Sequence, residues 1–357
     1  MAKPMADRDS QSRPQNGRAL LQRAANAARS SVAIADDLSA ALSPRSDVRF
    51  SDRMLSFSRQ FLQSIVGSIE IEICKTAIEE FDVSDPTLEA IAASDRIHSY
   101  ALLSKSGVLD DRALPEYVFV QAQKVELSSR LVEKISRTEL ENILTRYLNH
   151  GDKAIADAAM QFLVAQGREG TSSDTVLARR ESLPAEILHG LIWSICAALA
   201  RLAGAGENQL IAATQKILTE HDEGQSAARC AERLAQLINV SEDPEIQSPH
   251  PLLDGIELFV ARLAIMARLT PGQIYTFTAE EQMARLVVVL KALGIEPQTA
   301  LSLHASLDGT GEALTAATYK EMDVQDARYM LQSWHLDPAY QAARHAMESA
   351  VTGSTDR

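Results

Sequence analysis

Histidine is the side chain best suited to serve near neutral pH as a catalytic base, a phosphoryl acceptor or a zinc ligand, and this chain has eight. They are His98, His150, His189, His221, His250, His304, His335 and His345. They form no H-E-x-x-H motif, and none stands at close spacing from a cysteine, so a zinc site would require distant residues to converge. The sequence therefore predicts neither a metal site nor a bound cofactor.

Two of these histidines stand where a helix could present them to a phosphoryl donor. His189 lies beside a glycine in PAEILHGLIWSICAALARL, as in a helical phosphotransfer protein, and His98 lies in SDRIHSYALL. Neither is followed by the acidic residue that often assists phosphohistidine chemistry. We expect both to be partly exposed structural residues, and His150, which precedes Gly151, to mark the end of a helix.

Signatures of enzymes are missing from the chain. It has no G-x-x-x-x-G-K-[ST] phosphate loop, no G-x-G-x-x-G turn and no G-x-S-x-G elbow. The acidic pairs are expected at helix ends, where carboxylates are solvated or act as caps: Glu79-Glu80, Asp110-Asp111 and Glu280-Glu281. The sequence thus offers no catalytic residue, and we expect no enzymatic activity.

Aromatic residues make up only 5% of the chain. A set of them could form a binding surface, because aromatic side chains concentrate at binding hot spots. The set comprises Trp193, Trp334, Tyr275, Phe277, Tyr319, Tyr329 and Tyr340. Core packing is the expected use of most of them.

The elements that position these residues are predicted to be helices. Hydrophobic residues make up 46% of the chain, with alanine and leucine dominant, which suits helix packing better than strands. A chain of 357 residues is long enough for two domains or a repeat array. The net charge of −13 argues against nucleic acid as a partner, since binding to nucleic acid depends on clustered Lys and Arg.

Cysteine usage and hydropathy indicate the compartment. Cys74, Cys196 and Cys230 are far apart, each on the apolar side of a predicted helix, so no disulfide framework is indicated. The strongest membrane-span candidate, Gly190–Gly206, is short and is interrupted by Arg201. With no secretory leader, we expect a cytoplasmic protein without a transmembrane segment.

Proline and capping residues predict where helices begin. Asp or Thr precedes proline at Asp85-Pro86, Thr270-Pro271 and Asp337-Pro338. Capping-box spacing occurs at Ser136 with Glu139, Thr270 with Gln273, and Thr278 with Glu281. These signals predict helix starts near 86, 137, 271 and 279.

Apolar residues at steps of three and four predict the most strongly buried helices. The clearest follows Pro184, where one broad face runs from Ile187 to Leu202. Residues 252–269 and 284–293 behave similarly, and the run from 286 to 290 suggests a central helix, with a strand as the alternative. Leu-Pro opens an apolar helix in both ALPEYVFVQAQKVELSSRL and SLPAEILHGLIWSICAALARL, as in a degenerate helical repeat.

Composition divides the chain into three parts. Residues 1–49 are basic and are expected to be a partly disordered tail, with a possible docking helix from Gly17 to Leu42; an organellar transit peptide is the alternative. Residues 50–168 and 175–352 are predicted as two helical arrays joined by the linker GREGTSSD. The predicted fold class is all-α, an array of stacked antiparallel helices that is HEAT-like or an irregular α-solenoid.

A family resemblance rests on FSDRMLSFSRQFLQSIVGSIEIEICKTAIEEF followed by DPTLEAIAASDRIHSYALLSKSGVLDDRAL. Glu72 to Lys75, Pro86, Ile91 to Asp95, and Ser106 with Leu109 and Asp110 match its pattern. The chain resembles, over roughly residues 50 to 310, an alphaproteobacterial family of uncharacterised helical proteins with HEAT-like repeats, a domain of unknown function. The resemblance implies a helical fold and carries over no catalytic residue.

These observations lead us to expect a function that does not involve catalysis. We expect a scaffold or adaptor that binds another protein through a helical groove or concave face, and the chain is also compatible with a homo-oligomer. One alternative is a bacterial signalling module, acting in phosphotransfer or response-regulator binding. Another is a small-ligand sensor with an apolar pocket between helices.

Overall fold

The computed structural model describes residues 17–30, 52–94, 96–134, 143–169, 180–203, 206–308 and 314–336, with 340, 343 and 347 besides. Every regular element in these ranges is helical, and none is a strand. The predicted all-α fold is therefore confirmed. The helix starts predicted near 137 and at Asp337-Pro338 lie outside the described residues.

The described helices differ widely in length. In chain order they are α1 (Gly17–Ser30), α3 (Asp52–Phe81), α4 (Pro86–Ala92), α5 (Tyr100–Ser106), α6 (Ala113–Lys134), α8 (Thr145–Leu148), α9 (Lys153–Glu169), α10 (Ala185–Leu202), α11 (Glu207–Thr219), α12 (Ala227–Val240), α13 (Pro244–Gln247), α14 (Pro251–Ala267), α15 (Pro271–Thr278), α16 (Ala284–Ala292), α17 (Pro297–Leu307), α18 (Ala316–Glu321) and α19 (Val324–Trp334). Short 3₁₀ turns are η2 (Val108–Asp110), η3 (Arg180–Ser182), η4 (Glu223–Gln225) and η5 (Glu281–Met283).

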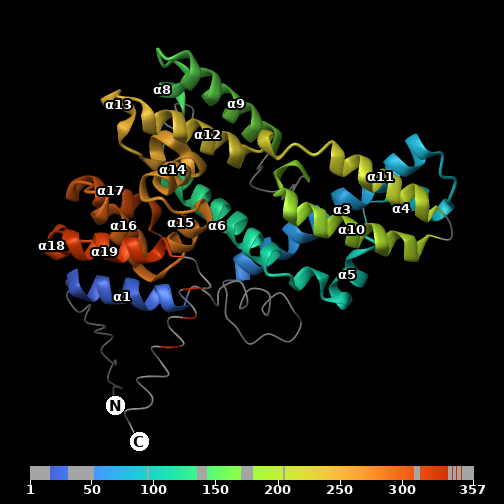
Figure 1. Ribbon diagram of the computed structural model, residues 1–357, viewed down its shortest axis with the longest axis horizontal. Coiled ribbons are helices and arrows are strands. Elements are labelled where there is room, and N and C mark those ends of the chain that lie inside the picture. Colours follow the sequence, from blue (N-terminus) through green and yellow to red (C-terminus); the bar gives the residue numbers. More distant parts are fainter. Residues whose placement is uncertain are drawn as a thin grey trace, which may run out of the picture.

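Buried apolar side chains of the described residues gather into three cores. The α3 core is built by α3, α4, α5, α10, α11 and the first turns of α6. The α9 core is built by α8, α9, α12, α13 and one face of α14. The α16 core is built by α1, α15 to α19, the end of α6 and another face of α14. Figure 1 shows the α3 core on the right, the α9 core at the upper left and the α16 core at the lower left.

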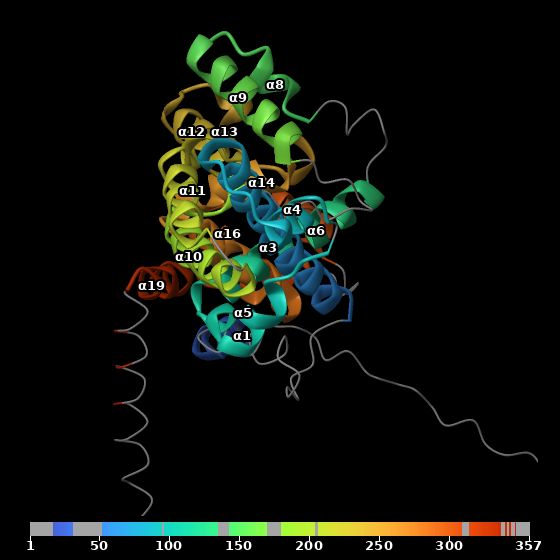
Figure 2. The same ribbon diagram turned by 90° about the vertical axis from the view of Figure 1, so that its right-hand side faces the viewer.

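Two helices, α6 and α14, join these cores. Leu114 at the start of α6 belongs to the α3 core, whereas Leu131 near its end belongs to the α16 core. In α14, Leu258 packs into the α9 core and its neighbour Phe259 into the α16 core, because successive helical residues point about 100° apart. The three cores therefore meet around these two helices. Figure 2 gives the second view, with α8 and α9 at the opposite end of the molecule from α1.

Local capping signals set two of the predicted helix starts. The Asp85 carboxylate accepts a hydrogen bond from the Thr87 backbone N–H at 2.7 Å, and Pro86 is the first residue of α4. Thr270 and Gln273 form a capping box at the start of α15. The starts predicted near 86 and 271 are confirmed.

The start predicted near 279 is wrong. Thr278 is the last residue of α15, and α16 begins only at Ala284, after two residues in left-handed conformations. Between the helices, Glu280 forms an ion pair with Arg285. Glu280 is therefore not the solvated helix-end residue that was expected: burial raises its pKa, although Arg285 opposes this. Thr278 does not cap a new helix, because its hydroxyl donates to the backbone carbonyl of Tyr275 within α15 at 2.7 Å.

The apolar run from 286 to 290 forms a central helix, α16, and not the alternative strand. Its residues are buried on all sides, because α1, α15, α17 and α19 pack around it. A helix that is apolar all round requires such an enclosed position.

Helix α10 follows Pro184, as predicted. By length and composition it is apolar enough to cross a membrane, and it is the one such helix among the described residues. Leu188, Ile192 and Leu199 are buried in the α3 core, where α10 packs against α3, α5 and α11. A buried core helix can be equally long and apolar, so these properties of α10 do not distinguish a membrane span from a core helix. The expected cytoplasmic location stays a prediction.

Helix α1 begins at Gly17, where the predicted tail helix begins, and it packs into the α16 core through Leu20 and Ala24. A Cβ at Gly17 would lie 2.6 Å from the backbone nitrogen of Met322, so the close approach of the two backbones requires glycine. Residues 31–51 lie outside the described part of the chain. Each of the three cores contains helices from both sides of the predicted linker, GREGTSSD. The division of the chain into the helical arrays 50–168 and 175–352 stays a prediction.

Candidate functional site

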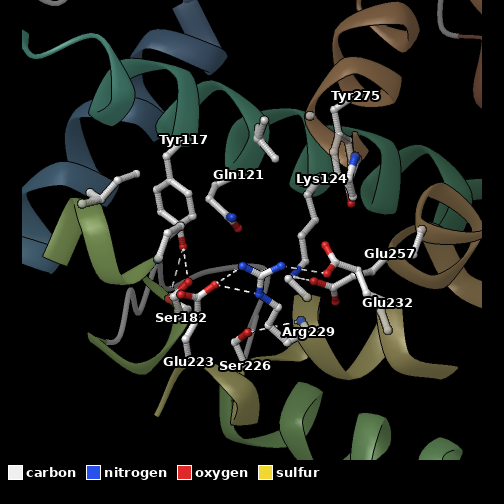
Figure 3. Close-up of a pocket in the computed structure, with 18 of the residues that line it drawn as sticks. Tyr117, Gln121, Lys124, Ser182, Glu223, Ser226, Arg229, Glu232, Glu257 and Tyr275 are labelled. Atoms are coloured by element: carbon white, nitrogen blue, oxygen red, sulfur yellow. Dashed lines mark hydrogen bonds and ion pairs between the residues drawn. The ribbon is translucent and has the colours of Figure 1, made fainter. Parts of the chain in front are cut away.

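A pocket of about 470 Å³ lies where the three cores meet. Helices α6, α10, α12, α14 and α15 form its wall, together with the end of α9 and the turns before α10 and α12. Its volume falls within the range of small-molecule sites, roughly 300–1,000 Å³. Figure 3 shows that polar side chains from several of these elements converge in it.

One face of α6 contributes six residues to this wall. They lie three or four residues apart along one side of the helix: Ala113, Glu116, Tyr117, Val120, Gln121 and Lys124. The Tyr117 hydroxyl donates a hydrogen bond to the backbone carbonyl of Ser182 at 2.9 Å. This bond, drawn in Figure 3, holds the η3 turn against α6.

Lys124 forms the charged centre of the site. Its Nζ lies 2.7 Å from Oε1 of Glu257 on α14 and 3.5 Å from Oε2 of Glu169 at the end of α9. Burial lowers the pKa of Lys124, but the two carboxylates outweigh burial and raise this pKa above its ordinary value. The side chain is therefore an ammonium ion at neutral pH, which is not a nucleophile.

Glu169 also ties two helices together. Its Oε1 accepts a hydrogen bond from the backbone N–H of Ala227, the first residue of α12, at 2.8 Å. Burial raises the pKa of Glu169, although the Lys124 ammonium opposes this. The end of α9, the start of α12 and the face of α6 are thus joined through one carboxylate.

Two buried polar atoms beside Lys124 have no hydrogen-bond partner in the structure. One is Oε2 of Glu257 and the other is the hydroxyl of Tyr275 on α15. The two residues are 9% and 4% exposed, and both line the pocket. Burial raises the pKa of Tyr275, so its hydroxyl keeps its proton. A buried polar atom left unsatisfied costs about 1–3 kcal/mol, so these two atoms call for a further group in the pocket.

Arg229 forms a second charged group on the opposite wall, on α12. Its Nε donates to Glu223 at 2.7 Å and its Nη1 to Glu232 at 2.9 Å. The other oxygen of Glu223 accepts from the backbone N–H of Ala185, the first residue of α10, at 3.1 Å. These contacts connect α10 with α12 through Glu223, whose ion pair with Arg229 is drawn in Figure 3.

The histidines considered for chemistry lie elsewhere. His98 and His189 are exposed, and no histidine among the described residues lines the pocket. His189 contacts Trp193 edge to face, with ring centroids 6.5 Å apart. His150 follows α8, as predicted, and lies 3.1 Å from Asp243.

The cysteines and aromatics are placed mostly as the sequence indicated. The three cysteines are free and buried. In the described part of the chain no group of three His, Cys, Asp or Glu side chains is arranged to hold a metal ion. Tyr275, Phe277, Tyr319 and Trp334 are buried, whereas Tyr329 is 75% exposed. Of these aromatics, Tyr275 contributes to the pocket.

Sequence reasoning missed the residues at the centre of the site, Lys124, Glu169 and Glu257. The available signal was a charged residue within an otherwise apolar helix: Lys124 in YVFVQAQKVEL and Glu257 in LLDGIELFVARLAIMARL. Such a residue is rarely buried unless it is paired. The sequence could have suggested two buried charges, but not that they meet.

The fold and the site define an all-helical protein with an open pocket between three cores, whose wall combines apolar surface with several charged side chains. Residues 99–344 match a family described as uncharacterised proteins conserved in bacteria, DUF2336, and the chain belongs to this family. The match includes every residue of the pocket. No curated protein and no solved structure shows significant similarity to the chain.

Proposed function

We propose that this protein is a non-enzymatic small-molecule sensor that holds its ligand in the pocket between the three cores. One observation carries the proposal: Glu257 Oε2 and the Tyr275 hydroxyl are buried without partners in a cavity of about 470 Å³. A ligand that supplies the missing hydrogen bonds would bind there at little cost in reorganisation.

The ionic state of the two pocket cations argues against a catalytic use of either. Lys124 is held as an ammonium ion between two carboxylates, and Arg229 is held by Glu223 and Glu232. Neither cation has a free lone pair near neutral pH, so neither can act as a general base or nucleophile.

The position of the pocket supports a sensing function. A ligand there would contact α6, which enters the α3 core, α12 and α14 of the α9 core, and α15 of the α16 core. Because such a ligand binds the folded arrangement of all three, it would stabilise their relative position.

A thermal-shift screen of soluble metabolites against the full chain tests the proposal. We expect at least one compound to raise the melting temperature, and to raise it less in Glu257→Gln and Tyr275→Phe. Glu133→Gln is the matched control, since Glu133 is exposed on α6 and outside the pocket. If no compound stabilises the protein, or if all variants respond equally, the proposal is wrong.

A protein-binding adaptor is the second candidate, favoured by an apolar stripe on α9. Met160, Leu163 and Val164 stand at helical spacing and are 52%, 42% and 46% exposed. Helix α9 packs on α12, which packs on α14, and this order supports the proposal of a HEAT-like array. That the chain belongs to an alphaproteobacterial subgroup of its family also stays a proposal. Crosslinked pull-down with Leu163→Asp tests the stripe: a partner or second copy bound by the wild type should be lost, and equal capture would contradict this function.

A further inference from the structure

We infer that the pocket selects an organic cation, a small molecule that joins a protonated amine to an apolar body. The inference rests on the proposed function and names the ligand class of the same site. Three features of the pocket lead to it: the excess of acidic side chains, the kind of polar atom left without a partner, and the apolar remainder of the wall.

Acidic side chains outnumber basic ones on the pocket wall. Six glutamates line it, against one lysine and one arginine. Lys124 contacts Glu169 and Glu257, and Arg229 likewise contacts two glutamates. Each cation is therefore already neutralised, and each group keeps a surplus carboxylate. In a cleft with low-dielectric walls this surplus attracts a positive charge and repels an anion.

Both atoms without a partner, Glu257 Oε2 and the Tyr275 hydroxyl oxygen, can accept a hydrogen bond from a ligand. An ionised carboxylate only accepts hydrogen bonds, and the other oxygen of Glu257 already accepts from Lys124. The Tyr275 hydroxyl can accept as well as donate. A ligand ammonium has several N–H donors and can serve both atoms, with a charge-assisted bond to the carboxylate. A carboxylate or phosphate ligand would instead bring further acceptors against Glu257 Oε2.

The rest of the wall fits an apolar body. Val120, Ile187 and Pro271 present aliphatic surface, and Tyr117 and Tyr275 add aromatic rings. An aromatic face also attracts a cation placed against it. The cavity of about 470 Å³ is far larger than an ammonium ion needs, so the ligand has a body as well as a charged end.

Calorimetry with three probes that share a phenethyl body tests the ligand class on the full chain. Phenethylamine is the cation, 2-phenylethanol the neutral probe and 3-phenylpropanoate the anion. We expect phenethylamine to bind on the order of tenfold more tightly than the alcohol and the anion to bind most weakly. Added salt should weaken binding of the amine more than that of the alcohol.

Variants connect this preference to the named atoms. Glu257→Gln should weaken phenethylamine binding by on the order of tenfold, and Glu133→Gln, which removes the same charge from the exposed face of α6, should leave it unchanged. Tyr275→Phe keeps the ring and the Lys124 ion pairs, so it carries the test if Glu257→Gln does not fold. Tyr275→Phe should weaken the binding of phenethylamine several-fold and affect the binding of 2-phenylethanol less.

The outcomes separate this inference from the proposed function. Tighter binding of the alcohol or the anion than of the amine overturns the ligand class while binding in the pocket stands. If none of the three probes binds, the metabolite screen decides. A cationic hit that needs Glu257 supports the inference, a neutral or anionic hit overturns it, and a screen without hits overturns the proposed function itself.

Discussion

Two buried polar clusters show how differently this protein uses charge. In the Asp254 cluster, formed by Tyr147, Asp254, Arg262 and Arg146, both carboxylate oxygens are engaged. Oδ1 accepts from the Tyr147 hydroxyl at 2.6 Å and from Arg146, and Oδ2 accepts from Arg262 at 2.9 Å and from the His250 backbone at 3.0 Å. Arg262 further donates to the backbone carbonyls at the end of α13.

The Lys124 cluster, formed by Lys124, Glu169, Glu257 and Tyr275, is incomplete. Two of its buried acceptors have no partner and face a cavity, whereas the atom without a partner in the Asp254 cluster is the Nε of the partly exposed Arg146. The completed cluster joins α8, α13 and α14. We infer that the first cluster serves the fold and that the second leaves its hydrogen bonds for a ligand.

The largest expected effect comes from breaking the completed cluster. Arg262→Met removes one of the two arginines that pair with Asp254, which is fully buried, and leaves only Arg146. Removing one member of a buried ion pair costs about 3–5 kcal/mol, so we expect a loss of this size in the free energy of unfolding by urea. Arg233→Met is the control, because Arg233 contacts Gln161 at the exposed surface of α12. A loss no larger than that of the control would show that the cluster does not hold the fold.

Removing a hydroxyl from the same cluster gives a smaller loss. In Tyr147→Phe, Asp254 loses a donor and Arg262 loses the acceptor that its Nη1 contacts at 2.8 Å. We expect about 1–3 kcal/mol lower stability, measured by urea unfolding. Unchanged stability would mean that solvent or neighbouring groups replace these bonds.

The Lys124 cluster is expected to make the free energy of unfolding depend on pH. Because burial raises the folded-state pKa of Glu169, this group favours folding below its unfolded pKa, about 4.3, and the contribution is lost as pH rises through the folded value. The stability of the wild type relative to Glu169→Gln should therefore decrease as the pH rises above about 4.3. Urea unfolding at several pH values measures it, and a relative stability that rises over this range would contradict the account.

Tyr275→Phe should be the one of these changes that does not destabilise the ligand-free protein. Its hydroxyl has no partner, so removing it breaks no hydrogen bond and should raise stability by up to about 1 kcal/mol. The contrast with Tyr147→Phe is the sharpest form of the comparison, because the chemical change is identical. Thermal unfolding of both variants in parallel tests it, and a similar loss in both would remove the distinction between the clusters.

The fold was predictable wherever the signal lies within a few residues. The starts of α4 and α15 could be predicted because each cap is formed by residues that are close in sequence, Asp85 with Pro86 and Thr270 with Gln273. The start of α16 carries no local signal of this kind, because Met283 precedes it in a left-handed conformation and forms no side-chain cap.

The candidate site could not be read from the sequence for the same reason. Lys124 and Glu257 are 133 residues apart, and they meet only because α6 and α14 cross between the cores. Tyr275 was visible only as one aromatic among several. No local periodicity indicates that a buried carboxylate will keep one oxygen without a partner.

A crystal structure of the full chain, isolated under mild conditions from the cells that naturally produce it, tests the central claim most directly. The account predicts electron density for a molecule larger than water, with a donor within about 3.2 Å of both Glu257 Oε2 and the Tyr275 hydroxyl. Density for water alone, or a side chain of the protein filling these two positions, would contradict it.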